Sequence, residues 1–275
     1  MQIKSLTMRG ILFFITLFSV CSFSLEAQEK TNQTDEEGLR QGYWEQRYPN
    51  GNLRYKGHFV DGKPVGELIR YFESGDKMAI MDFDKTGTVA RATLFYENGY
   101  PAAEGKYVNE KRDSVWKFFS RHQDSLLTAK EMYNMGERDG VSKTFYPGGE
   151  VSQTLAYKNG LRHGQWKQFY EGGRLKLEGN YYEDKREGSF KMYNSQGIKE
   201  VEGKYEDNLM HGDWKFFNER GDHLYTVEYN RGNPENEDEL IKGEQELFRF
   251  IEEQQGKIPE PDETERFFEP HPVKP

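Results

Sequence analysis

Short runs in which apolar and polar residues alternate fill the chain from residue 42 to residue 232. In the run from Leu175 to Tyr181, every second residue is apolar or glycine, so one face of an extended strand carries all of them. A glycine turn at 172–173 precedes this run, and a polar turn at 183–185 follows it. The pattern therefore predicts β-hairpins joined by tight turns.

The hairpins recur with a period of 24 residues. Two extra residues near 121–125 interrupt the period once, and eight repeats then cover residues 42–232. Positions in a repeat are counted from its first residue, the anchor. The anchors are Gly42, Gly66, Ala90, Ser114, Gly140, Gly164, Gly188 and Gly212. This self-similarity predicts a repeat architecture in which each unit contacts its neighbours.

Aromatic residues occupy fixed columns of the repeat. An aromatic stands at position +17 in all eight repeats and at +5 in seven, and glycine stands at +9 in seven. Because a packing position must be filled in every unit, we expect the +17 aromatics to be buried. Position +2 is more variable, since Ala92 and Ser142 occupy it in two repeats. The tryptophans of this column are therefore the predicted partner-binding residues: Trp44, Trp116, Trp166 and Trp214.

These features predict an all-β fold. We expect an elongated single-layer antiparallel β-meander of about eight 24-residue hairpin repeats, with about sixteen strands, followed by a short C-terminal helix. A single layer cannot bury both faces, and positions +2 and +5 lie on opposite faces because side chains alternate along a strand. One aromatic row is therefore expected to stay half-exposed.

A known family shares this motif. The arrangement Gly-x-Trp-x-x-x-Tyr-x-x-Gly, followed by a short strand and an Asn-Gly or Asp-Gly turn, resembles the MORN repeat. It is most similar to the variant found in multiples in bacterial proteins, including those called YwqK-family antitoxins. The resemblance implies an elongated sheet of hairpins that associates with proteins or membrane surfaces without catalysis. The second repeat departs from the motif, because Met81 stands where other repeats have glycine.

The N-terminus has the order of an export signal. Lys4 and Arg9 precede an apolar run at 11–20, and small and polar residues follow up to Ala27. We expect residues 1–27 to be a signal peptide, cleaved before Gln28, and the mature chain to be periplasmic or extracellular without a transmembrane segment. Lipid anchoring through Cys21 is the alternative, which the preceding valine disfavours.

The segments that flank the repeats differ in composition. Residues 28–41 are polar and are expected to form a flexible linker. Residues 42–232 hold 29 acidic and 29 basic residues, whereas residues 233–275 hold 13 acidic and five basic ones. A helix is expected to begin at Asn236, whose first turn is acidic, and a proline-rich tail follows it. This helix is expected to cover the last strand edge, and docking of a partner is the alternative.

Composition and motifs argue against several functions. The formal net charge is −9, which disfavours nucleic-acid binding. Cys21 is the only cysteine of the chain, so a disulfide or cysteine zinc site is not expected. His163 and His211 occupy the same turn column, and the letters of a catalytic triad at 122–125 stand in one loop rather than converging. We therefore predict no catalytic residue, metal or cofactor, and no enzyme activity.

The predicted function is that of an exported, non-enzymatic scaffold that binds a protein partner or a surface polymer. Two alternatives stay open at this point. One is an antitoxin or immunity protein of a toxin system, which the family resemblance implies. The other is an envelope module that binds phospholipid or glycan, although the neutral array and acidic tail argue against anionic lipid. The sequence leaves the oligomeric state open.

Overall fold

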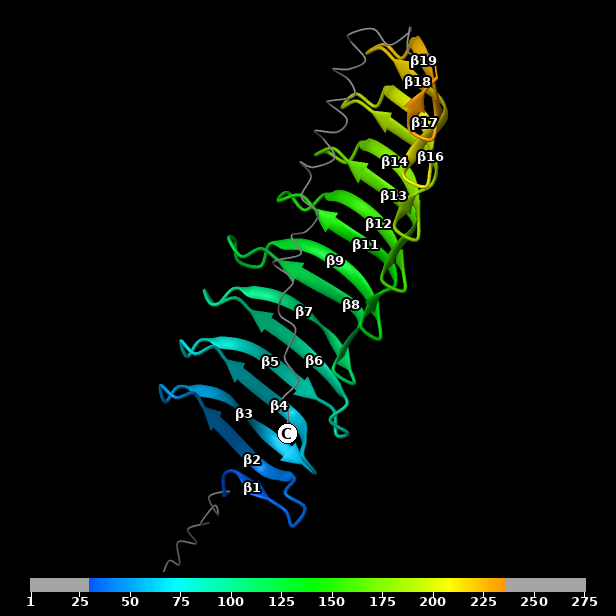
Figure 1. The fold of residues 1–275 in the computed structure, drawn as a ribbon. Coiled ribbons are helices and arrows are strands. Elements are labelled where there is room, and N and C mark those ends of the chain that lie inside the picture. The colour runs from blue at the N-terminus through cyan, green and yellow to red at the C-terminus, as the bar shows by residue number, and fades with distance from the viewer. Residues whose placement is uncertain (1–29, 236–275) are drawn as a thin grey trace, which may run out of the picture.

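A computed structural model describes residues 30–235 of the 275-residue chain. These residues form one open antiparallel sheet in which successive strands are hydrogen-bonded neighbours (Figure 1). No helix long and apolar enough to cross a membrane occurs among them. The strands are β1 Gln33–Thr34, β2 Arg40–Arg47, β3 Leu53–Val60, β4 Lys63–Tyr71, β5 Lys77–Phe83, β6 Val89–Phe95, β7 Pro101–Val108, β8 Lys111–Phe119, β9 Leu127–Asn134, β10 Glu137–Arg138, β11 Gly140–Phe145, β12 Val151–Lys158, β13 Leu161–Phe169, β14 Leu175–Tyr182, β15 Lys185–Arg186, β16 Gly188–Tyr193, β17 Lys199–Glu206, β18 Leu209–Phe217, β19 His223–Asn230 and β20 Asn233–Pro234.

The predicted all-β meander of hairpin repeats is confirmed. Sixteen strands of six or more residues make the hairpins, and β1, β10, β15 and β20 are two-residue pieces. Both β10 and β11 pair with β9, so they are two parts of one strand, and β15 and β16 relate to β14 in the same way. The predicted signal peptide at 1–27 and the predicted helix from 236 fall outside the described residues.

Part of the expected linker is ordered structure instead. Gln33 pairs with Gln41, and Thr34 pairs with Arg40, so β1 adds a short strand to the first hairpin. The indole Nε1 of Trp44 donates a hydrogen bond to the backbone oxygen of Gln33 at 2.9 Å. The prediction of a flexible linker over 28–41 is therefore wrong for this part, because these polar residues pair with the first strand edge.

Two turn types alternate along the edges of the sheet. At the +9 edge, five-residue turns such as 48–52 are closed by hydrogen bonds between backbone atoms, with Gly51 at φ 89°. The other edge carries two-residue turns in which both residues have positive φ, as a type I′ hairpin requires. These turns are Asp61-Gly62, Asn109-Glu110, Met135-Gly136, Asn159-Gly160, Glu183-Asp184, Asp207-Asn208 and Arg231-Gly232.

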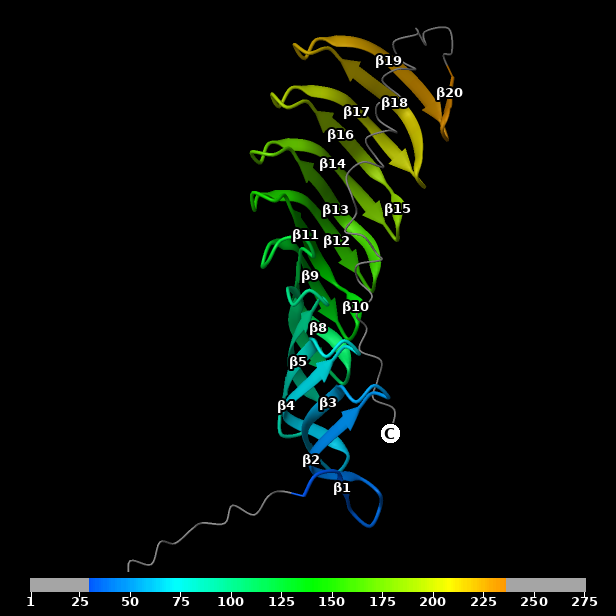
Figure 2. The ribbon, with the colours of Figure 1, turned by 90° about the vertical axis from the view of Figure 1, so that its left-hand side faces the viewer.

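The anchor residues bend the strands. Seven anchors have positive φ, and the register between neighbouring hairpins shifts beside them, for example opposite Gly66 and Gly212. A bulge of this kind increases the local right-handed twist, and Figure 2 shows the strand direction rotating from the first half of the sheet to the second. Ala90 is the exception: its φ is not positive, and β5 and β6 pair without a register shift.

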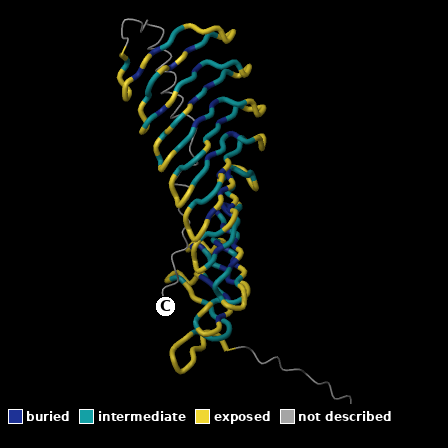
Figure 3. Tube along the Cα trace, turned by 90° about the vertical axis from the view of Figure 1, so that its right-hand side faces the viewer, coloured by how far each residue is buried: buried dark blue, intermediate teal, exposed yellow. Residues whose placement is uncertain are grey.

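One face of the sheet carries the core. We call it the aromatic face, because it carries positions +2, +4, +13, +15 and +17, including Phe59, Trp116 and Tyr229. Buried residues lie along the middle of the strands, and exposed ones gather at the turns (Figure 3). The core has two apolar clusters, one between Tyr55 and Tyr133 and one between Leu177 and Tyr229.

Between the two clusters the aromatic face becomes polar. We call this region the polar seam (Glu131, Ser142, Gln153 and Gln168). Gln153 Oε1 accepts hydrogen bonds from Gln168 Nε2 at 3.0 Å and from Trp166 Nε1 at 3.1 Å. Glu131 is 3 % exposed, accepts a hydrogen bond from the Tyr133 hydroxyl and lies 3.7 Å from Arg138 Nε. Glu131, Gln153 and Gln168 are therefore hydrogen-bonded, whereas the buried hydroxyl of Ser142 has no hydrogen-bond partner among residues 30–235.

Candidate binding surfaces

A column of arginines covers the +17 aromatics at the type I′ edge. Each arginine stands two residues before an anchor, and its guanidinium lies over the +17 ring of the same repeat. The distance from Cζ to the ring centroid ranges from 4.1 Å for Arg40 over Phe59 to 5.5 Å for Arg112 over Tyr133. The remaining pairs are Arg138 with Tyr157, Arg162 with Tyr181, and Arg186 with Tyr205. We call these five pairs the arginine ladder.

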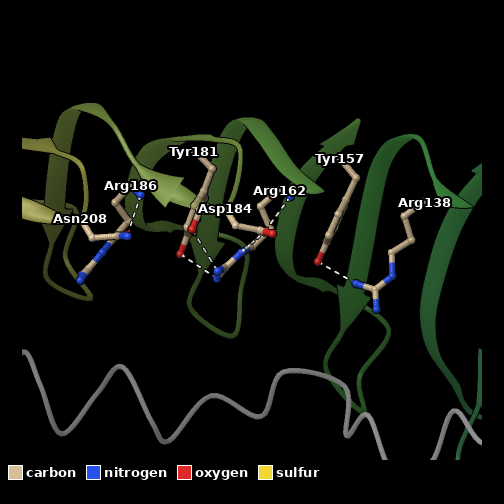
Figure 4. A network of polar contacts seen from close by, with 7 residues as sticks. All are labelled: Arg138, Tyr157, Arg162, Tyr181, Asp184, Arg186 and Asn208. Atoms are coloured by element: carbon tan, nitrogen blue, oxygen red, sulfur yellow. Dashed lines mark hydrogen bonds and ion pairs between the residues drawn. The ribbon is translucent and has the colours of Figure 1, made fainter. Parts of the chain in front are cut away.

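Hydrogen bonds fix the ladder arginines. Figure 4 shows the guanidinium of Arg138 turned toward the Tyr157 hydroxyl, to which Nη1 donates at 2.8 Å. The Arg162 backbone N–H and Nε both donate to Asp184 Oδ1 at 2.9 Å. Partial burial acts to raise the pKa of Asp184, but these hydrogen bonds outweigh it and the pKa is lowered. The ladder therefore combines cation–π contacts with charge-assisted hydrogen bonds.

The tryptophans do not form an exposed row. Trp116 and Trp214 are 0 % and 1 % exposed, and Trp44 and Trp166 are half-buried. They share the aromatic face with the +17 residues, since Trp214 lies 5.0 Å from Tyr205 between ring centroids. The expectation that the variable +2 column is the more exposed one is therefore wrong for Trp116 and Trp214. A role of the four tryptophans in partner binding stays a prediction.

Glycine at +15 makes room for the tryptophans. A Cβ on Gly105 would lie 2.2 Å from Trp116, and one on Gly203 would lie 2.3 Å from Trp214. Where the +2 residue is small, a larger neighbour fills the space, as Met81 does opposite Ala92. At these positions the size of the +2 side chain matches that of a cross-strand neighbour, whereas Trp166 has Leu155 opposite it on one side.

A cavity interrupts the aromatic face in the first three repeats. Its volume is about 380 Å³, which lies within the range of small-molecule pockets. The apolar part consists of side chains of the aromatic face, and basic residues stand at its rim. The lining residues are Arg40, Phe59, Gly62, Lys63, Pro64, Leu68, Arg70, Met81, Phe83, Gly87, Thr88, Tyr107, Asn109 and Glu110.

The cavity lies where the arginine ladder is interrupted. Pro64 and Thr88 occupy the arginine column in the second and third repeats, beside the +17 aromatics Phe83 and Tyr107. The type I′ turn is also replaced there by the five-residue turn 84–88, in which Asp84 Oδ1 accepts hydrogen bonds from several N–H groups of the turn. Neither proline nor threonine can cover an aromatic ring as arginine does, so a hollow remains.

The opposite face carries a row of lysines at its middle. We call it the lysine face, and the lysine row is Lys117, Lys130, Lys143 and Lys167. In the register of the sheet, Lys117 pairs with Lys130, and Lys130 pairs with Lys143. Lys143 and Lys167 make no ion pair within residues 30–235. Beyond Lys167 the same row alternates in sign, with Glu178 opposite Lys191 and Glu202 opposite Lys215.

Apolar side chains flank the lysine row. Val115, Met132 and Val141 lie on one side of it and are 47 %, 43 % and 46 % exposed. On the other side, the +5 residues Phe119 and Phe145 are half-buried, and Lys130 Nζ lies 5.9 Å from the Phe145 ring centroid. The +5 column is thus the half-exposed aromatic row expected from the parity of the strands.

The histidines do not converge with one another. The His163 ring lies 5.0 Å from that of Tyr182, and His211 Nε2 lies 3.4 Å from Glu206 Oε2. Among the residues that the structure describes, no group of three or more histidines and acids is placed to hold a metal ion.

Comparison with known proteins bears on the repeat. Three segments match the MORN repeat variant. They are residues 40–61, 138–159 and 162–183, so each match begins at an arginine of the ladder and ends in a type I′ turn. No curated protein matches the sequence.

One similar solved structure is "Crystal Structure of TcdB2-TccC3-Cdc42". The sequence identity is 9 %, and the match covers 74 % of this chain and 17 % of the other. This chain therefore spans about one sixth of the length of that one. The TM-score is 0.16.

Two further columns of the repeat, one of arginine and one of lysine, are visible in the sequence but were given no role in the predictions. Five of eight repeats have arginine two residues before the anchor, and five have lysine at +3. Both columns follow the same 24-residue period as the aromatics. Their roles depend on which residues stand opposite, and that requires the register of neighbouring hairpins.

Proposed function

We propose that this protein is an exported, non-enzymatic scaffold whose lysine face binds an acidic segment of a protein partner. The observation that carries the proposal is the register of the lysine row, in which Lys117 and Lys143 stand opposite Lys130 on the strands to either side of it. The matches to the MORN repeat variant support a repeat scaffold.

The facing lysines Lys130 and Lys143 repel each other. Like charges directly opposite in an antiparallel pair are destabilising, and neighbouring strands lie only about 4.8 Å apart. Glutamates stand opposite both ends of the row, since Lys117 forms an ion pair with Glu104 at 3.3 Å and Lys167 is in register with Glu178, so the repulsion is concentrated at Lys130 and Lys143. A row of carboxylates laid across the strands would offset this repulsion.

The flanking residues favour a protein over a polysaccharide. Val115, Met132 and Val141 present exposed apolar side chains beside the lysines. A segment with alternating acidic and apolar residues places carboxylates over the lysines and apolar groups beside them. A polysaccharide would supply the charge but would leave these apolar side chains without a counterpart.

The test uses a ten-residue peptide in which glutamate and leucine alternate. We expect the double variant Lys130→Glu/Lys143→Glu to bind it at least about tenfold more weakly than the unmodified protein, by calorimetric titration. The matched control is Lys191→Glu/Lys215→Glu, which changes the net charge equally on the same face but leaves the lysine row intact. Binding is also expected to weaken as salt is raised.

Other outcomes distinguish the alternatives. Equal loss of binding in both double variants would mean that net charge, not the lysine row, attracts the peptide, and would overturn the proposal. Binding to anionic phospholipid vesicles or to an acidic polysaccharide, without binding to the peptide, would instead favour an envelope-binding module.

Export belongs to the same proposal. It is supported by the order of charged, apolar and small residues at 1–27. Fractionation of the producing cell, with the intact mass of the mature chain, tests it: a mass that begins at Gln28 in the envelope fraction is expected, and an acylated chain that begins at Cys21 would contradict it. An antitoxin role is supported by the family resemblance alone.

A further inference from the structure

The cavity of the first three repeats lies on the aromatic face, away from the lysine row, and the proposed function does not use it. We propose that this cavity is a binding site for an amphipathic carboxylate, with an apolar group of about ten carbon atoms held among the aromatic side chains and the carboxylate at the basic rim. The inference is independent of the proposed function, because the two sites occupy opposite faces of the sheet.

The floor of the cavity is apolar. Leu68 and Met81 are 4 % and 7 % exposed, and Phe59 and Tyr107 are buried beside them. Phe83 is half-buried and packs against this cluster. An aliphatic or aromatic group placed here displaces water from apolar surface, which is favourable by roughly 25 cal/mol per Å².

The rim is basic. Among the fourteen lining residues, Arg40, Lys63 and Arg70 are cationic and Glu110 is the acidic one. Burial lowers the pKa of Arg70. A carboxylate in the cavity is attracted by the charges of Arg40, Lys63 and Arg70, whereas an amine is repelled by them. The charge of the rim therefore selects an anion.

The cavity is a departure from the repeat rather than a general feature of it. Arginine fills the corresponding space in five of the eight repeats, and the second and third repeats lack it. Pro64 pairs with Phe59 in the same register in which Arg162 pairs with Tyr157, so an arginine at residue 64 would reach over Phe83 as Arg162 reaches over Tyr181. We therefore expect the arginine introduced by Pro64→Arg to fill the cavity, with its guanidinium over the Phe83 ring as in the arginine ladder.

The test uses decanoate as the probe and the full mature chain. Calorimetric titration measures affinity, and the NMR signal of the Met81 methyl group, assigned with Met81→Leu, reports occupation of the cavity. We expect decanoate to bind and shift this signal, and decylamine to bind at least about tenfold more weakly. A peptide with a C-terminal leucine, titrated in parallel, distinguishes a free fatty carboxylate from a chain terminus as the natural source.

The variants separate the site from its fold. Pro64→Arg is expected to abolish the Met81 shift and to leave the melting temperature unchanged or higher, while Pro64→Ala keeps binding. Lys63→Gln/Arg70→Gln is expected to weaken decanoate binding at least about tenfold but not that of decanol. Unchanged decanoate binding in Pro64→Arg, equal binding of decylamine, or absence of any Met81 shift with the unmodified chain would each overturn the proposal.

Discussion

The guanidinium of Arg186 lies 4.3 Å from the ring centroid of Tyr205 and donates a hydrogen bond to its hydroxyl at 3.1 Å. Tyr205 itself packs 5.0 Å from Trp214 between ring centroids. The arginine therefore covers the outer side of an aromatic stack that a single-layer sheet would otherwise leave open to water. The same cation–π contact recurs in five repeats.

Removal of the charge from a ladder arginine should destabilise the fold. We expect Arg186→Met to lower the free energy of unfolding by roughly 1–2 kcal/mol, because the cation–π contact and the hydrogen bond to Tyr205 are lost while the aliphatic stem is kept. Denaturant unfolding measures the change. The adjacent Lys185→Met is the control: Lys185 pairs with Asp207 at an exposed site, and its loss should leave the unfolding free energy unchanged. Equal effects would contradict the ladder.

The close approach of glycine and tryptophan gives a graded prediction. A Cβ on Gly203 would lie 2.3 Å from Trp214, whereas one on Gly179 would lie 3.4 Å from its nearest neighbours. We expect Gly203→Ala to lower the free energy of unfolding by roughly 2–3 kcal/mol and Gly179→Ala by less than about 1 kcal/mol. Thermal and denaturant unfolding of both variants checks the order, and a reversal of the order would mean that Trp214 is not packed on Gly203.

Alkaline pH should weaken the fold through Tyr133. Burial, together with the charge of Glu131, raises the pKa of Tyr133 to about 12. A tyrosine in the unfolded chain ionises near 10, so the contribution of Tyr133 is present below pH 10 and is lost as the pH rises toward 12. The difference between these two pKa values corresponds to roughly 3 kcal/mol of unfolding free energy.

Unfolding curves between pH 8 and about 12 measure this loss. We expect stability to fall less steeply with pH in Tyr133→Phe than in the unmodified chain, even though the variant starts from a lower stability because Glu131 loses a hydrogen bond. The exposed Tyr182→Phe should keep the original slope. The same slope in all three proteins would contradict the assignment.

Deletion of one repeat should preserve the fold. Removal of residues 164–187 joins His163 to Gly188 and brings Arg162 to the position from which Arg186 covers Tyr205. We expect a shorter, cooperatively unfolding β protein, because contacts are between neighbouring hairpins. Deletion of residues 164–175 removes one strand and reverses the direction of all that follow, so it should aggregate. Circular dichroism and light scattering distinguish the two, and equal folding of both would contradict the hairpin assignment.

The repeat, the hairpins and the burial of five of the eight +17 aromatics were predictable from local pattern, whereas Phe83, Tyr157 and Tyr181 are only half-buried. A period of 24 residues and turn glycines are properties of the sequence itself, and Gly51 and Asn159-Gly160 adopt the positive φ that their turns require. The burial of Trp214 was not predictable in this way. The variety of residue types at +2 suggested that this column is exposed. Trp214 is buried instead, because Gly203 on the neighbouring strand leaves room for its ring.

The cavity and the lysine row required the register between hairpins. Pro64 and Thr88 are ordinary residues in the sequence and acquire meaning only beside Phe83 and Tyr107. Likewise, Lys130 at +14 and Lys143 at +3 belong to different columns, and only the pairing of β9 with β11 places them opposite each other. The pattern within one repeat therefore does not predict which residues of neighbouring repeats stand opposite each other.

The polar seam separates the two apolar clusters of the aromatic face, and Gln153 and Gln168 meet there through a hydrogen bond that water can replace. The lysine row lies directly behind the seam, since Lys130 adjoins Glu131 and Lys143 adjoins Ser142 on the same strands. A segment bound along that row would cross the boundary between the two clusters. We therefore expect binding on the lysine face to restrict bending of the sheet at this boundary.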